Sequence, residues 1–179
     1  WLYNGLMVLA CAIVISRTIL VEHERAAWVA FSVGMVAWAF GEIWFTAVEP
    51  ETYPSVADLG YLVFYPSAYV GIVLLVRVRA RAVAGTLWLD GVTASVAAAA
   101  IAAAVLVEMV ILETEGSTST VVTNLAYPLG DVLLLSAVFG VFSLARWRPG
   151  PLWLLIGVGL LATAVADSIF LFQSADETY

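Results

Sequence analysis

Long apolar runs separated by short polar joints form the dominant pattern of the chain. Each run has close to the roughly 20 residues that a helix needs to cross the hydrocarbon core of a bilayer. The runs are continuous and do not alternate, so they predict helices and not the roughly ten-residue strands of membrane barrels. We therefore expect an all-α protein, a polytopic transmembrane helix bundle of about six spans, at residues 2–20, 26–48, 57–76, 86–112, 121–145 and 152–172.

Charges at the joints between the runs predict which side of the membrane each joint occupies. Arginines mark every second joint, in the ranges Arg17–Arg25, Arg77–Arg81 and Arg146–Arg148. The intervening joints carry acids instead, Glu49 with Glu51 and Glu113 with Glu115. Because cytoplasmic loops retain positive charge, the arginine joints are predicted to be cytoplasmic and residue 1 to lie outside. The expected location is the inner (cytoplasmic) membrane of a bacterium, with multiple passes.

Composition supports a membrane location and excludes several classes of protein. The chain is 63% hydrophobic and 12% charged, with a mean hydropathy of +1.01, which is more apolar than soluble domains are. The net charge is −7, and the arginines form short clusters beside the membrane with no basic face, which disfavours a nucleic-acid partner. Because lysine is absent and Cys11 and His23 are single, a Schiff base, an internal disulfide and a bis-histidine haem are excluded, and no cofactor is expected.

The ends of the chain indicate a fragment of a longer membrane region. Residue 1 is Trp1, and no signal-peptide pattern precedes the first run. We interpret residues 1–179 as a single transmembrane domain. His23, with Glu22, Glu24 and Arg25, is expected to form a solvated cytoplasmic turn and no metal site, because these neighbours lack a metal-ligand pattern.

Two of the runs resemble each other. WVAFSVGMVAWAFGEIWF (Trp28–Phe45) and WLLIGVGLLATAVADSIF (Trp153–Phe170) align without gaps, and the carboxylates of Glu42 and Asp167 coincide. Tyr65-Pro66 and Tyr127-Pro128 are a weaker echo between two other runs. Both aligned runs are predicted to point outward, so we expect a parallel internal repeat in which span 2 is like span 6. Chance similarity between apolar helices is the alternative.

Small residues recur at four-residue spacing within the runs. Such faces let membrane helices approach closely, so they predict packing and carry no functional weight. The sets are Ala37/Gly41, Ala94/Ala98/Ala102 and Ala162/Ala166.

Carboxylates within the runs are the candidate functional groups, because ionisable residues inside a membrane are costly. Six lie within or at the edges of the spans, and no lysine or arginine is at the depth of the outer ones. Aromatic residues accompany them at helical spacing, and Asp58, Tyr61, Tyr65 and Tyr69 follow one such stripe. This spacing places both kinds on shared helix faces. We predict an outward-facing cavity for a ligand or ion, lined by Glu42, Asp58, Asp131, Asp167, Trp38, Tyr65 and Tyr127. The remaining two acids are Asp90 and Glu108.

A structural interpretation of the same residues stays open. Asp58 falls in the first turn of its helix, where an acid is favourable against the helix dipole. Tyrosine and tryptophan are common interface anchors in any membrane protein. Enzyme motifs such as H-E-x-x-H, G-x-S-x-G and the P-loop are absent, so the segment is not predicted to be a catalyst.

Several phrases of the chain are similar to a known family region. They are YPSVADLGYLVFYPSAYVGIVLLVR, LWLDGV, AYPLGDVLLL and VADSIFLFQ. The resemblance covers nearly the whole chain and is to the amino-terminal multi-span region of actinobacterial cyclic-di-GMP signalling proteins, which precedes cytoplasmic GGDEF and often EAL domains. It implies a parent protein that is a diguanylate cyclase, a cyclic-di-GMP phosphodiesterase or both. No GGDEF or EAL motif occurs in these residues.

The leading hypothesis is a membrane sensory or anchoring region that regulates such a cytoplasmic domain. Its expected partners are the lipid bilayer, the signalling domain of the same parent chain, and a small ligand or cation; a homodimer is left open. The alternatives are a cation- or proton-coupled transporter or channel, and a structural membrane subunit.

Overall fold

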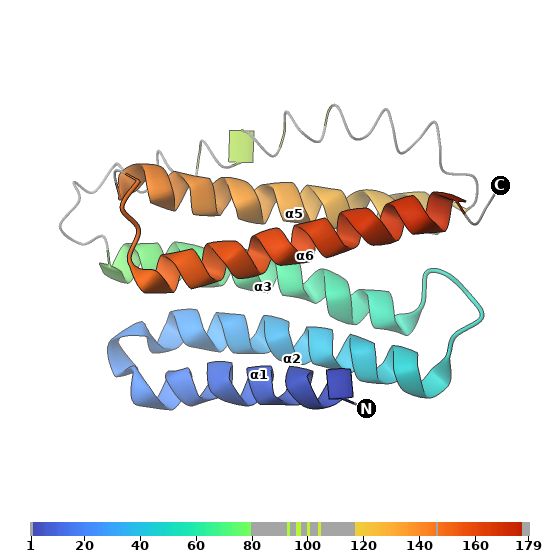
Figure 1. The fold of residues 1–179 in the computed structure, drawn as a ribbon, viewed down its shortest axis with the longest axis horizontal. Coiled ribbons are helices and arrows are strands. Elements are labelled where there is room, and N and C mark those ends of the chain that lie inside the picture. The colour runs from blue at the N-terminus through green and yellow to red at the C-terminus, as the bar shows by residue number, and fades with distance from the viewer. Residues whose placement is uncertain are drawn as a thin grey trace. The chain divides into compact units, whose positions relative to one another are not determined.

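The computed structural model describes residues 2–79, 93, 96–97, 100, 104, 117–145 and 147–176, with only the helical backbone for 170–176. These residues form helices joined by short connections, and none of them forms a strand (Figure 1). The helices are α1 (Leu2–Leu20), a 3₁₀ turn (Glu22–Glu24), α2 (Arg25–Val48), α3 (Val56–Arg79), α5 (Thr118–Leu144) and α6 (Pro151–Asp176).

Five helices in the described part of the chain are long and apolar enough to cross a membrane. The predicted all-helical class and the membrane-compatible helices are therefore confirmed. The fourth predicted span, 86–112, lies almost wholly outside the described residues, as do Asp90 and Glu108. Large apolar side chains are exposed on every one of the five helices, for example Leu155, which is 72% exposed. Such surfaces are costly in water and ordinary in lipid.

The helices extend beyond the apolar runs because backbone hydrogen bonds continue into polar residues. α3 begins one residue before the predicted span and continues to Arg79. α5 begins at Thr118, where the Ser117 hydroxyl accepts a hydrogen bond from the Thr120 backbone N–H at 3.3 Å. Ser117 is thus an N-cap, which satisfies one of the free amide groups at the helix start. Hydropathy therefore identifies the apolar part of each helix and not the polar residues at its ends.

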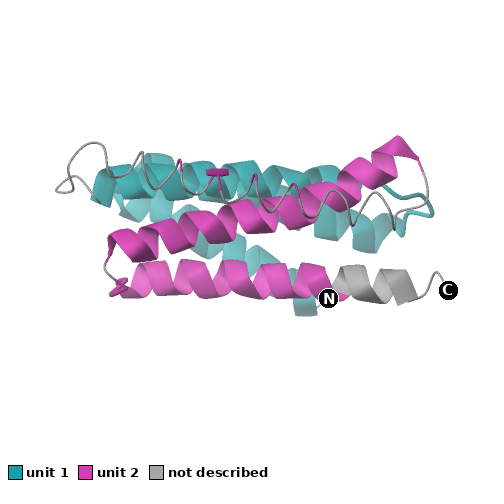
Figure 2. Cartoon of the chain, turned by 90° about the horizontal axis from the view of Figure 1, so that it is seen from above, with its two compact units in different colours: residues 1–88 teal, residues 89–179 magenta. Residues whose placement is uncertain are grey.

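The chain divides into two compact units, residues 1–88 and 89–179 (Figure 2). In the first unit α2 packs against both α1 and α3, and in the second α5 packs against α6. The α5–α6 contact uses Gly157, where an added Cβ would lie 3.0 Å from a Val138 methyl group. The buried face of α6 is Trp153, Gly157, Leu160 and Ala164, whereas Ala162 and Ala166 are exposed.

The closest approach in the first unit is the crossing of α2 and α3. A Cβ built on Gly60 would lie 2.5 Å from the Ala37 carbonyl oxygen, and one built on Gly41 would lie 2.7 Å from the Ala57 carbonyl oxygen. Backbone therefore meets backbone, as the small-residue pair Ala37/Gly41 predicted. Of the other predicted small faces, Ala94/Ala98/Ala102 lies outside the described residues.

Candidate functional site

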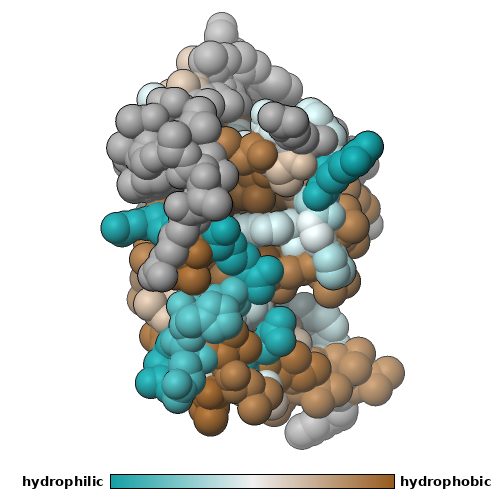
Figure 3. Space-filling view, turned by 90° about the vertical axis from the view of Figure 1, so that its left-hand side faces the viewer, coloured by the Kyte–Doolittle hydropathy of each residue, from teal (hydrophilic) through white to brown (hydrophobic). Residues whose placement is uncertain are grey.

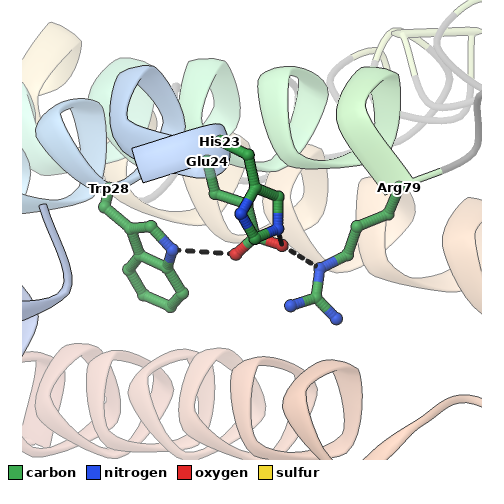
Figure 4. Close-up of polar contacts among 4 residues, drawn as sticks. All are labelled: His23, Glu24, Trp28 and Arg79. Atoms are coloured by element: carbon green, nitrogen blue, oxygen red, sulfur yellow. Dashed lines mark hydrogen bonds and ion pairs between the residues drawn. The ribbon is translucent and has the colours of Figure 1, made fainter. Parts of the chain in front are cut away.

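A buried carboxylate stands at the joint between α1 and α2. Glu24 is 2% exposed and accepts two hydrogen bonds, from Arg79 Nε at 2.6 Å and from Trp28 Nε1 at 3.0 Å. His23 Nε2 lies 3.5 Å from the same oxygen that Arg79 reaches (Figure 4). A buried carboxylate is tolerated only with paired charge and hydrogen bonds. Glu24 has both: Trp28 and Arg79 donate the hydrogen bonds, and Arg79 carries the opposite charge.

Local geometry explains half of this network. Trp28 follows Glu24 by four residues, which places the indole over the helix start, and its ring also faces Arg17, whose Cζ lies 4.9 Å from the ring centroid. Arg25 Nε donates to the Thr18 carbonyl oxygen at 3.1 Å. The joint is therefore ordered by specific polar contacts. The expectation of a solvated turn is wrong for Glu24, although His23 is exposed.

The other half of the network is tertiary. α3 runs back beside α2, so the last turn of α3 lies next to the joint before α2. Arg79 therefore contacts Glu24, although the two residues are 55 positions apart in the chain. Two arginine joints of the first unit thus lie at one end, as the charge pattern predicted. Hydrophilic side chains gather at that end (Figure 3). We call Glu24, Trp28 and Arg79 the arginine-end cluster.

A second polar cluster lies further along α2. Glu42 follows Glu24 by 18 residues, about 27 Å along a helix axis. Its half-buried carboxyl group makes side-chain hydrogen bonds with Tyr61 of α3 and Tyr3 of α1. Residues of three helices therefore meet at one carboxyl group. We call Glu42, Tyr61 and Tyr3 the Glu42 cluster. The sequence interpretation included Glu42 and noted Tyr61 in an aromatic stripe, but it missed Tyr3.

The other predicted cavity residues of the first unit have packing or capping contacts. Trp38 packs against Phe64 with tilted rings whose centroids are 5.2 Å apart, and buried Tyr65 meets the same Phe64 ring edge-on at 5.8 Å. Asp58 Oδ2 accepts hydrogen bonds from the Ser55 backbone N–H at 2.7 Å and from the Ser55 hydroxyl at 3.1 Å. The Ser55 hydroxyl in turn accepts from the Ala57 N–H at 3.2 Å.

This Ser55–Asp58 pair is a capping box at the start of α3, which supports the structural interpretation of Asp58. Partial burial and the nearby Asp58 carboxylate also raise the pKa of Tyr53 to about 12.

The remaining predicted cavity residues belong to the second unit. Asp131 is 8% exposed on α5, and Tyr127 precedes it by four residues on the same face. Asp167 is half-buried on α6. The seven predicted residues are thus divided between the units, four in the first and three in the second. Among the described residues no group of three or more histidine, cysteine or acidic side chains is placed to hold a metal ion.

Compared with known proteins, the chain matches no family model, no curated protein and no solved structure.

Proposed function

We propose that the chain is the sensory and anchoring membrane region of a bacterial signalling protein whose cytoplasmic domain makes or degrades cyclic-di-GMP. One observation carries the proposal: α2 has a carboxylate near each end, and each one contacts α3. Glu42 bonds to Tyr61 near the start of α3, and Glu24 pairs with Arg79 at its end. Such an arrangement can relate events at Glu42 to the arginine-end cluster.

The glycine crossing supports this mechanism. Gly41 precedes Glu42 and Gly60 precedes Tyr61, so the polar contact lies at the level where the two backbones touch. A ligand, cation or proton taken up by the Glu42 cluster would change the spacing of α2 and α3 at that level. It shifts the output only if it binds two helix arrangements with different affinity. Packed helices transmit such changes because their contacts have discrete alternatives.

The proposal includes the finer topology. Six spans, with 86–112 as the fourth, cross the bacterial cytoplasmic membrane and keep the arginine joints inside. Residues 28–45 and 153–170 are repeats of one unit. Trp28 and Trp153 are both buried, which supports the repeat. The aligned glycines Gly34 and Gly159 differ in their contacts. Gly34 packs on α3, whereas Gly159 faces open space.

The test uses the full-length protein that carries this region, reconstituted in vesicles. Cyclic-di-GMP turnover is measured over a range of pH and of candidate cations, for the native protein and for Glu42→Gln. The variant should flatten the response while basal turnover persists. Glu49→Gln, which changes an exposed acid at the C-cap of α2, is the matched control and should respond as the native protein does. An unchanged response in Glu42→Gln would reject the Glu42 cluster as the receiving site.

A transporter or channel for cations or protons is the second candidate. The buried Asp131 within apolar α5 favours it, because a buried acid in a membrane helix is typical of ion pathways. It predicts uptake into proteoliposomes that Asp131→Asn abolishes. A purely structural subunit is favoured instead if Glu42, Asp131 and Asp167 can all be neutralised without loss of response or flux.

A further inference from the structure

An open groove of about 700 Å³ runs along α2 in the first unit. α2 forms its floor, from Val29 to Phe40. Ile15 and Thr18 of α1 form a wall at the arginine end, and Leu59 and Val63 of α3 form a wall at the other end. The groove therefore connects the polar joint with the middle of the helix bundle.

The lining selects a hydrocarbon occupant. Its only hydroxyl groups belong to Thr18 and Ser32, and both bond to their own helices: Thr18 Oγ1 donates to the Ile15 carbonyl at 2.7 Å and Ser32 Oγ to the Trp28 carbonyl at 2.8 Å. The groove thus offers apolar surface and no directed polar group, which suits an alkyl chain better than a peptide backbone.

The length of the groove matches one leaflet of a bilayer. Phe40 follows Val29 by eleven residues, which is about 17 Å along the helix axis. Half of the roughly 30 Å hydrocarbon core is about 15 Å. Arg25 lies on the same face as Val29, one turn or about 6 Å further out, where the headgroups of that leaflet begin.

Arg25 supplies charge complementarity at the mouth of the groove. Its Nε contacts Thr18, a residue of the groove wall, and the guanidinium side chain is 56% exposed. A guanidinium carries five N–H donors and binds phosphate well. Among the described residues, the Arg25 guanidinium contacts the Thr18 carbonyl oxygen and the Glu22 carboxylate. The pair with Glu22, at 3.4 Å, is exposed on both sides and therefore weak.

We propose that this groove binds a glycerophospholipid with an anionic headgroup. One acyl chain lies along α2 between the α1 and α3 walls, and the phosphate group contacts Arg25. The inference goes beyond a signalling role, because it needs only that these helices stand in a bilayer.

The experiment measures lipids retained by the purified full chain. The protein is released from membranes that hold equal amounts of phosphatidylglycerol and phosphatidylcholine, and bound lipids are counted by native mass spectrometry. The native chain should retain one phosphatidylglycerol in roughly fivefold preference, the factor expected for one arginine at an anionic surface. Arg25→Gln should remove the preference and Arg25→Lys should largely keep it.

A second variant tests the groove itself. Val33→Trp places a large ring on the groove floor and should lower retention of both lipids at least fivefold. Val158→Trp on α6 is the control, because Val158 is similarly exposed and does not line the groove. Circular dichroism verifies that each variant is helical.

Three results would overturn the proposal. The first is equal retention of the two lipids by the native chain, and the second is unchanged lipid retention in Val33→Trp. The third is a lipid-free dimer of the chain that dissociates in Val33→Trp. The last result would identify a second copy as the occupant. Because Val33→Trp leaves Arg25 in place, it decides the matter even if Arg25→Gln fails to fold.

Discussion

The crossing of α2 and α3 allows a sharp prediction about the stability of the first unit. In Gly60→Ala the new methyl group would lie 2.5 Å from the Ala37 carbonyl oxygen, about 0.9 Å short of the 3.4 Å at which ordinary contact begins. The obstacle is backbone, which cannot rotate away as a flexible side chain does. The two helices must therefore separate over the whole crossing.

The magnitude follows from two opposing effects. Overpacking of this kind costs about 1–3 kcal/mol, because a gap of 0.5–1 Å forfeits a quarter to a half of each dispersion contact. Alanine in place of a helical glycine returns about 1 kcal/mol through helix propensity. We expect Gly60→Ala to lower the free energy of unfolding by up to about 2 kcal/mol. Gly159→Ala, which meets open space on α6, should be neutral or stabilising by up to about 1 kcal/mol.

The assay is reversible unfolding in mixed micelles with a denaturing detergent, followed by far-ultraviolet circular dichroism. Gly41→Ala provides an internal check, because its methyl group would meet the Ala57 carbonyl at 2.7 Å in the same crossing. The double variant should cost less than the sum of the two single ones, since helices that are already separated accept the second methyl group. Equal stability of Gly60→Ala and Gly159→Ala would refute the close crossing.

Two further predictions concern charged groups. Arg79→Gln should lower the free energy of unfolding by about 2 kcal/mol, because it leaves Glu24 buried with fewer donors; the 41% exposure of Arg79 keeps this below the 3–5 kcal/mol of a fully buried pair. The double variant Arg79→Gln/Glu24→Gln should recover much of the lost stability. Chemical unfolding of the native protein, the single variant and the double variant measures this difference. Asp58→Ala and Ser55→Ala should each cost about 1 kcal/mol in thermal unfolding through the capping box, while Asp58→Asn, which keeps an acceptor oxygen, should cost less. Loss of signalling output in Asp58→Asn with unchanged stability would show instead that the charge of Asp58 is functional.

The Glu24 network illustrates why sequence patterns identified some polar residues and missed others. Hydropathy treats Glu22, His23, Glu24 and Arg25 alike, as one polar joint. Only Glu24 turns inward, because Trp28 and Arg79 offer it donors there. Trp28 is within one helical turn and was a readable signal. Arg79 is 55 residues away, and its pairing depends on how far α3 extends beyond its apolar run.

The Glu42 cluster shows the same division. A carboxylate within an apolar run is conspicuous in any sequence, and helical periodicity placed Tyr61 near Asp58 and Tyr65 on one stripe. Periodicity within a helix cannot tell which tyrosine meets a carboxylate on another helix. The rotation of α3 against α2 decides that, and the contact of Gly41 with Gly60 sets that rotation.

The sequence by itself determined that the chain is helical, where its long apolar helices lie, and which joints share a side in the first unit. These properties follow from the solvent: lipid demands continuous apolar helices, and charges remain in the joints. Only the tertiary structure decided that Glu24 is buried with Arg79, that Glu42 contacts Tyr61 and Tyr3, and that a groove opens along α2 beside Arg25. These depend on helix rotation and separation, which contacts between residues far apart in the chain determine.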